Sequence, residues 1–234
     1  MVKVGIITNS AVLSKSIAIF LISRGYYANH IFTNQFEEQK DFDIFVIDFD
    51  GINKIFQNQS TEILDKLQET QKPIILITHE KSSSKLQEFA KKGVKGIVDS
   101  NLNISIIPEK IYEIIQTLPI KDDDKRKHYR VPIDFGILKV EIPPSRLVEG
   151  KITDISAGGI GAIFKTEEEA NMFINNKAYP CEVVVSNIAI KPKIFLVRRD
   201  GLLCGFKFFG LDEKQLSKIS ELIYHNIIEK THKT

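Results

Sequence analysis

The first half of the chain alternates short apolar runs with amphipathic segments. Runs rich in β-branched residues predict strands at 4–7, 27–32, 43–49, 73–78 and 96–98. Apolar spacing of helical type predicts helices at 12–23, 60–69, 83–92 and 108–117. Continuous apolar strands are typical of parallel sheets that helices cover on both faces. Residues 1–118 are therefore expected to form a doubly wound α/β domain.

The pattern changes after Pro119. Residues 119–130 are highly charged and lack apolar periodicity, which predicts a linker that ends in an arginine-bearing arm. Beyond it, apolar segments separated by turn residues predict strands at 131–142, 148–155, 159–164, 181–186, 190–198 and 203–209. Six short strands at this spacing favour a small closed antiparallel barrel, so residues 131–234 form the second expected domain.

An amphipathic helix is expected at the end of this second domain, at residues 211–229. Asp212 is a good N-cap, and the apolar positions of the segment form one stripe. Packing of that stripe on the barrel is the favoured interpretation, with a partner-binding surface as the alternative.

Composition restricts the partners. A net charge of +2 gives no global field toward nucleic acid or anionic lipid, so any anion site must be local. The apolar stretch around 18–22 is too short to span a bilayer, and we expect no membrane insertion. Cys181 and Cys204 lack metal or redox spacing and fall on apolar segments, which favours buried thiols. These features together predict a cytoplasmic protein.

Two short motifs flank the first strands of the predicted barrel. Arg126 and Arg130 form an RxxxR pair at the end of the charged segment (RKHYR), and residues 154–159 read DISAGG, a DxSxxG pattern. Each motif alone is weak, because surface arms are often basic and turns favour Asp, Ser and Gly. Arg126 could merely pair with the acidic residues 122–124, and DISAGG could be an ordinary Asx turn. The two motifs in this order are much more specific.

Residues 125 to about 230 resemble a PilZ domain, the bacterial receptor module for cyclic di-GMP. RKHYR matches the arginine arm of that family, DISAGG its turn, and the segment LVRRDGLLCGFKFFGL its closing strand pair. The resemblance implies that Arg126 and Arg130 contact guanine and phosphate, while Asp154, Ser156 and Gly159 form the opposite wall. It also implies that position 125, here Lys125, influences whether one or two ligand molecules bind.

The chemistry of these side chains suits such a ligand. Arginine can meet the O6 and N7 acceptors of guanine bidentately, and it can also bind phosphate. The carboxylate of Asp154 can accept from guanine N1–H and N2–H2 with charge assistance. Gly158 and Gly159 are expected to permit unusual backbone angles and close approach of the ligand. Arg199 is a secondary candidate for the same site.

The first domain resembles a response-regulator receiver. Asp48 ends the third predicted strand, where receivers place the phospho-acceptor, and Thr78 matches their conserved hydroxyl. The acidic pair is replaced by Thr8-Asn9-Ser10, and Asp99-Ser100 stands where receivers place a lysine. Phosphoryl transfer needs a metal ion and a cation to neutralise charge, so Asp48 is predicted to be a vestigial acceptor. The domain is then expected to serve in docking or dimerisation.

No enzyme is expected, because the sequence carries no nucleophile elbow, zinc-protease motif or P-loop. The histidines show no metal spacing, and no cofactor is predicted; the expected ligand is cyclic di-GMP. The leading hypothesis is a receptor that turns ligand binding into an interdomain or partner-binding change, with a protein partner or homodimer through the first domain. The alternatives are a PilZ-like interaction adaptor without nucleotide binding and a phosphorylation-driven response regulator.

Overall fold

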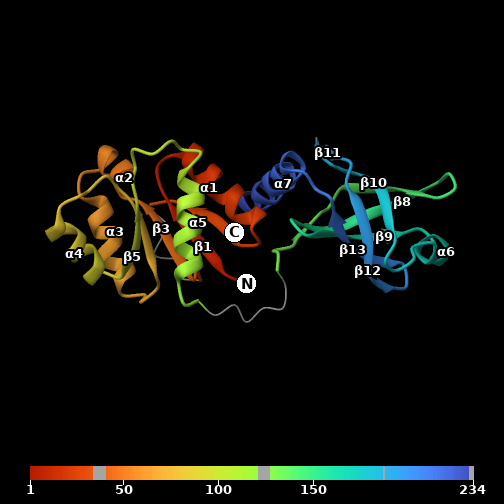
Figure 1. Ribbon diagram of the computed structural model, residues 1–234, viewed down its shortest axis with the longest axis horizontal. Helices are drawn as coiled ribbons and strands as arrows, with labels where there is room; N and C mark the ends of the chain where they lie inside the picture. Colours follow the sequence, from red (N-terminus) through yellow and green to blue (C-terminus); the bar gives the residue numbers. More distant parts are fainter. Residues whose placement is uncertain (34–40, 121–126, 187, 232–234) are drawn as a thin grey trace. The chain divides into compact units, whose positions relative to one another are not determined.

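The computed structural model describes residues 1–33, 41–120, 127–186 and 188–231, and the chain divides into two compact units, residues 1–126 and 127–234 (Figure 1). Residues 121–126 of the expected linker lie outside the described residues. The limits 119–130 of that linker therefore stay a prediction.

A parallel sheet of five strands forms the centre of the N-terminal unit. The strands are β1 (Lys3–Ile7), β2 (Tyr27–Ile31), β3 (Ile44–Asp48), β4 (Ile74–Ile77) and β5 (Val94–Val98). Their order is β2-β1-β3-β4-β5, and every pairing is parallel. This is the doubly wound order that places ligand crevices beyond the carboxyl ends of the strands. The predicted fold class of this half is confirmed.

Helices lie on both faces of that sheet (Figure 1). They are α1 (Ala11–Ser23), α2 (Phe49–Ile55), α3 (Gln59–Gln68), α4 (Ser83–Lys91) and α5 (Ile107–Thr117). Side chains of α2, α3 and α4 share one buried cluster with β3 and β4, and α1 packs beside α5. Helix α2 was not predicted; it starts where Asp48 accepts a hydrogen bond from the amide of Gly51 at 3.0 Å and caps the first turn.

The C-terminal unit is an antiparallel β-structure. Its strands are β6 (Val131–Pro132), β7 (Gly136–Ile142), β8 (Arg146–Ser156), β9 (Gly159–Phe164), β10 (Ala178–Val185), β11 (Ile188–Ile190), β12 (Lys193–Asp200) and β13 (Leu203–Phe209). Six of them close into a ring in which β7, β8, β9, β13, β12 and β10 pair in turn and β10 returns to β7. The predicted six-stranded barrel is confirmed.

Two predicted strands are each divided into two. The segment 131–142 gives β6 and β7, and the segment 190–198 overlaps both β11 and β12. A proline stands at each division, Pro132 at the end of β6 and Pro192 between β11 and β12. Proline has no amide hydrogen to donate to a strand ladder, which explains why neither strand continues.

Aromatic side chains fill one end of the barrel. Phe164, Phe173, Tyr179 and Phe206 are buried and contact one another, with ring centroids 4.9 to 6.1 Å apart. The short helix α6 (Glu167–Asn171) leads into Phe173. The Tyr179 hydroxyl accepts a hydrogen bond from the amide of Ile174 at 2.8 Å, so its polar tip is satisfied although the ring is buried.

Helix α7 (Glu213–Thr231) closes the described chain. Asp212 accepts from the amide of Gln215 at 2.7 Å, and the Gln215 side chain accepts from the amide of Asp212 at 3.2 Å. This is a reciprocal capping box, as expected for an N-cap at Asp212. The apolar stripe of the helix, including Ile219 and Ile223, is buried, and α7 packs on β6, β8 and β11. The favoured interpretation of that stripe is confirmed.

Candidate functional site

The arginine arm leads directly onto the end of β8. Val131 and Pro132 of β6 pair with Ile155 and Asp154 of β8. The residue before them, Arg130, donates from Nη1 to Asp154 Oδ1 at 2.7 Å, and 42% of the arginine side chain and 28% of the aspartate side chain are exposed. The structure thus brings Arg130 and Asp154 together at the barrel surface. Lys125 and Arg126 lie outside the described residues.

Two β-bulges decide which side chains face outward here. On β8 the register shifts between Ile152 and Asp154, and on β12 it shifts between Leu196 and Arg198. Ile152 and Leu196 are buried, so strict alternation would turn Asp154 and Arg198 inward. Each extra residue reverses that parity. Asp154 and Arg198 therefore both lie on the outer face.

A floor without side chains lies between these two residues. Asp154 pairs with Gly161 of β9, Gly161 with Gly205 of β13, and Gly205 with Arg198 of β12. Cross-strand partners share a face of the sheet. A Cβ at Gly161 would collide with the Asp154 carboxylate, and one at Gly205 would contact Arg198 at 3.7 Å. The row therefore has the Asp154 carboxylate at one end and Arg198 at the other, where the Arg198 guanidinium donates to Asp200 Oδ2 at 3.0 Å. Of the two glycines between them, Gly161 is buried and Gly205 is half-buried.

The β8–β9 turn borders this row. The Ser156 hydroxyl is buried and donates to the carbonyl of Gly159 at 3.2 Å. Neither Gly158 nor Gly159 has a left-handed φ, so the expectation of unusual backbone angles is wrong. Both positions need glycine because neighbouring atoms leave no room for a side chain. A Cβ at Gly159 would collide with the carbonyl of Phe206, and one at Gly158 would lie 2.5 Å from Cδ2 of His128.

Sequence reasoning missed two cations of this face. Arg198 ends the glycine row, and Lys207 of β13 pairs with Gly159, which pairs with Ser156. The alternation in the predicted strand 203–209 could have indicated Lys207, since Phe206 and Phe208 on either side are apolar and buried. Arg198 and Lys207 lie close to the motif residues because of the strand register, and the sequence alone does not reveal that register.

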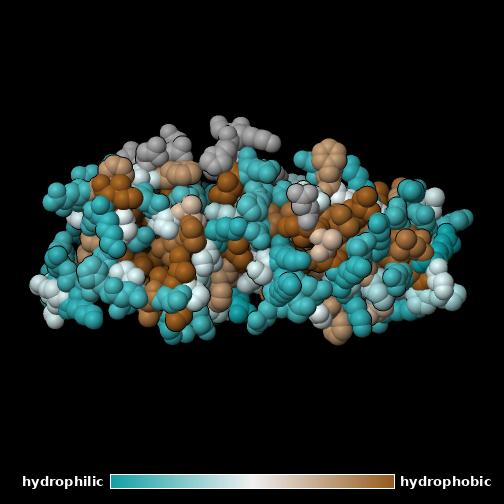
Figure 2. Space-filling view, turned by 90° about the horizontal axis from the view of Figure 1, so that it is seen from above, coloured by the Kyte–Doolittle hydropathy of each residue, from teal (hydrophilic) through white to brown (hydrophobic). Residues whose placement is uncertain are grey.

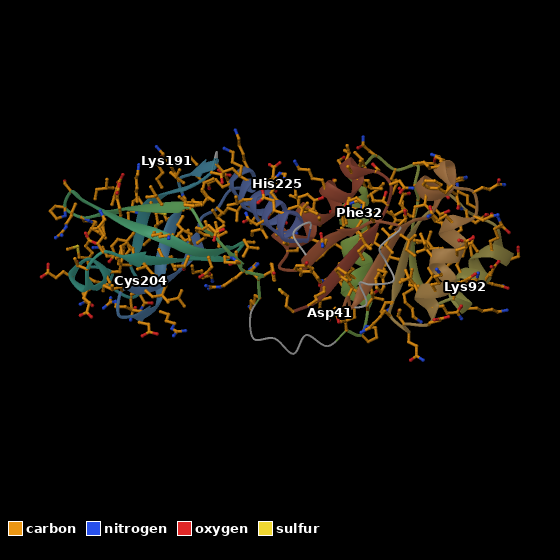
Figure 3. The ribbon with its side chains drawn as sticks, turned by 180° about the vertical axis from the view of Figure 1, so that it is seen from behind. Phe32, Asp41, Lys92, Lys191, Cys204 and His225 are labelled. Atoms are coloured by element: carbon orange, nitrogen blue, oxygen red, sulfur yellow. The ribbon has the colours of Figure 1, made fainter. Side chains whose placement is uncertain are left out.

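Arg199, the secondary candidate, has an exposed side chain that crosses to the loop after α6. It pairs across strands with Cys204, which is fully buried in the barrel (Figure 3). Its guanidinium donates to Asn171 Oδ1 at 2.8 Å and to the carbonyl of Phe173. Arg199 therefore ties the loop after α6 to β12, and the structure does not bring it to the Asp154 row.

The sequence profile of the PilZ domain matches residues 124–225. That range covers the arm, all six barrel strands and most of α7. The C-terminal unit is a PilZ domain. The N-terminal unit has a receiver-like topology, and the profile does not extend into its sheet. No curated protein sequence matches the chain.

Solved structures similar to this chain each cover about half of it. The PilZ domain of YcgR from Escherichia coli with c-di-GMP is 14% identical, covers 47% of this chain and 97% of its own, and has a TM-score of 0.43. The MrkH–c-di-GMP complex of K. pneumonia is 11% identical over 47% of this chain and 56% of its own, at a TM-score of 0.44. A two-component response regulator from Clostridium difficile is 15% identical over 51% of this chain and 100% of its own, at a TM-score of 0.39.

In the receiver-like unit, Asp48 stands at the carboxyl end of β3, as predicted. Only 7% of it is exposed. Its Oδ2 accepts from the Thr8 hydroxyl at 2.7 Å, and its Oδ1 accepts from the Gly51 amide at 3.0 Å. Thr8 occupies the place of the receiver acidic pair. Both oxygens of Asp48 therefore make internal hydrogen bonds, one to β1 and one to the start of α2.

Asp50 joins the ends of two further strands, a role that sequence reasoning missed. Its Oδ1 accepts from the Thr78 hydroxyl at 2.8 Å. Its Oδ2 accepts from the His79 amide at 2.7 Å and the Ser100 hydroxyl at 2.6 Å, and the His79 ring nitrogen lies 2.5 Å away. Burial raises the pKa of the Asp50 carboxyl, but these hydrogen bonds outweigh it and hold the pKa below its ordinary value.

Among the described residues, no group of three or more histidine, cysteine, aspartate or glutamate side chains could hold a metal ion. No helix in the described part of the chain combines the length and the apolar character of a membrane span.

Proposed function

We propose that the PilZ domain binds cyclic di-GMP on the outer face formed by β8, β9, β13 and β12, and that the protein acts as a receptor for this second messenger. The observation that carries the proposal is the meeting of Arg130 with Asp154 beside the Gly161–Gly205 floor. Donors for an anion and an acceptor for guanine N–H groups stand together there, as the family motifs require.

Each part of the face has a chemical role in this proposal. Asp154 accepts from N1–H and N2–H2 of a guanine, which lies over the half-buried backbone of Gly205. Arg126 and Arg130 meet a guanine Hoogsteen edge or a phosphate. Lys207 stands on the Ser156–Gly159 side, where it can neutralise a phosphodiester. Gly158 belongs to the flank of the site, and Lys125, which lies outside the described residues, is proposed to influence how many ligand molecules bind.

The ion pair between Arg130 and Asp154 does not block the ligand. Both side chains are partly exposed, and an exposed pair of this kind contributes only about 0.2–1 kcal/mol. A bidentate contact between arginine and guanine discriminates against a wrong base by about 1–3 kcal/mol. A pair this weak is expected to open when the ligand offers both partners charge-assisted hydrogen bonds.

Calorimetric titration with cyclic di-GMP tests the site. Arg126→Ala and Arg130→Ala are each expected to abolish detectable binding, because each removes a cation that contacts the ligand. Arg146→Ala is the matched control; it removes an exposed arginine at the opposite end of β8 and is expected to bind as the wild type does. Linear GMP should give no comparable heat. If both arm variants bind as tightly as the wild type, the assigned site is wrong.

An interaction adaptor that does not bind nucleotide is the second candidate function. Thermal unfolding of the wild-type protein distinguishes it from the receptor. A ligand that binds only the folded state raises the unfolding temperature. The absence of any thermal shift at saturating cyclic di-GMP, in a wild-type protein with a normal unfolding transition, would favour the adaptor.

We infer that ligand binding changes either the arrangement of the two units or their binding to a partner protein. We also infer that the receiver-like unit serves in docking or dimerisation. Hydrophobic side chains reach the surface of this unit (Figure 2). Among the exposed ones are Ile97 of β5 and Leu102, Ile104 and Ile106 between β5 and α5. Sedimentation equilibrium with and without cyclic di-GMP tests the inference. A monomer under both conditions, together with no ligand-dependent partner, would contradict it.

The internal hydrogen bonds of Asp48 argue against the phosphorylation-driven alternative. A small phosphodonor with Mg²⁺ is expected to leave the intact mass of the protein unchanged, because no described cation contacts Asp48. A mass increase of one phosphoryl group that Asp48→Asn removes would restore that alternative.

A further inference from the structure

His128 lies at the middle of the arginine arm and rests on the β8–β9 turn. A Cβ at Gly158 would lie 2.5 Å from Cδ2 and 3.1 Å from Nε2 of its imidazole, so the ring occupies the space that a side chain at Gly158 would need. The DxSxxG pattern requires glycine at position 159 and leaves position 158 free. Gly158 has no left-handed φ that would demand glycine. His128 and Gly158 therefore form a fitted pair in addition to the two motifs.

The Nδ1 atom of that ring is buried and has no hydrogen-bond partner among the described residues. A buried polar atom without a partner is unfavourable, and it indicates a group that a ligand or a proton can satisfy. The charged groups of this face are Lys127 and Arg130 on the arm, Asp154 on β8 and Lys207 on β13. Arg130 and Asp154 are paired, so among the described residues Lys127 and Lys207 are the charges that act on His128.

Burial lowers the pKa of the His128 imidazole, and the charges of Lys127 and Lys207 lower it further. The ring is therefore neutral near pH 7 in the free protein. A bound dianion would offset the lysine charges and offer phosphate oxygens as acceptors. Both changes favour the imidazolium form, so the pKa rises on binding.

We propose that His128, held in place by Gly158, is a positioning residue of the arm that takes up a proton when cyclic di-GMP binds, so that affinity for the ligand increases as the pH falls. The inference rests on the proposed function of the site. The proton passes from the buffer to the imidazole, and no covalent bond changes. Linkage limits the effect: affinity increases at most about tenfold per pH unit between the free and bound pKa values.

Calorimetry between about pH 6 and pH 8, in buffers with different ionisation enthalpies, tests the proposal. The wild type is expected to take up a proton fraction that grows as the pH falls, with a matching rise in affinity. His128→Asn is expected to bind with an affinity that does not depend on pH. His225→Asn is the matched control, because His225 is an exposed histidine on α7 (Figure 3) whose loss should leave the wild-type pH dependence intact.

Gly158→Ala provides a second variant that keeps the histidine. Its Cβ would displace the ring, and the pH dependence should weaken while the arm arginines remain. A wild type that binds tightly with no proton uptake would overturn the proposal, and so would a His128→Asn variant with the wild-type pH dependence. Failure of the underlying function looks different, since the wild type would then give no heat at any pH.

Discussion

At the scale of single residues, two aspartates connect the carboxyl ends of the strands in the receiver-like unit. Asp48 holds β1 and caps α2, and Asp50 holds the ends of β4 and β5 through Thr78, His79 and Ser100. In both cases hydroxyl and amide donors surround a carboxylate of the protein itself. Hydrogen bonds to an ionised group are stronger than neutral ones, so these contacts stabilise the carboxyl edge of the sheet.

Asp50→Asn is expected to destabilise the N-terminal unit by about 2 kcal/mol at neutral pH, because an amide cannot accept from all of these donors. The pKa of Asp50 is lowered in the folded protein, so its contribution is fully present above about pH 4. The contribution is lost as the pH falls through the lowered folded value. Denaturant unfolding of both proteins across this range measures it, and a difference that stays constant into acid would contradict the assignment.

At the scale of elements, the parity of β12 assigns different roles to two adjacent arginines. The bulge after Leu196 places Arg198 beside Gly205 of the glycine row and directs Arg199 to Asn171 and Phe173, and both arginine side chains are exposed. A uniform strand would have reversed them. Bulges are common beside functional sites, where they redirect a side chain, and the bulge on β8 does the same for Asp154.

A pair of substitutions separates these roles. Arg198→Ala is expected to weaken cyclic di-GMP binding about tenfold, or about 1.4 kcal/mol, with little change in stability. Arg199→Ala is expected to lower the stability of the PilZ domain by about 1 kcal/mol, because it removes the hydrogen bonds to Asn171 and to the Phe173 carbonyl, and to keep the ligand affinity. Calorimetry and denaturant unfolding of both variants give the two quantities. Exchanged phenotypes would mean that the strand faces are assigned the wrong way round.

At the scale of the whole molecule, the chain has two units with separate cores. The sheet and helices of one unit enclose an aliphatic and aromatic cluster, while the barrel encloses its own phenylalanines. The described residues of the proposed site all belong to the C-terminal unit. A ligand there should stabilise that unit directly.

Differential scanning calorimetry is expected to resolve two transitions. Cyclic di-GMP at about 100 times its Kd should stabilise the PilZ domain by about 2.7 kcal/mol and raise one transition alone. Phe173→Ala, which removes a buried ring from the barrel core, should lower that same transition through a loss of about 3–5 kcal/mol. A single transition that shifts as a whole in both experiments would show that the units unfold as one.

The sequence alone determined the two fold classes and the short motifs, because both depend on local pattern. Apolar runs predicted the parallel sheet and the barrel, and Asp212 predicted the start of α7. It also supplied Arg130 and Asp154 as partners in one site, through the resemblance of RKHYR and DISAGG to a known domain.

Only the tertiary structure decided which other residues join them. Strand register brings Arg198 and Lys207 to the face of the proposed site, and the bulge on β12 directs Arg199 to Asn171 and Phe173 instead. Gly158 leaves space for the His128 ring, and this contact depends on how the arm crosses the β8–β9 turn. Local pattern follows from neighbouring residues, whereas register, bulges and close approach depend on packing between segments far apart in the chain.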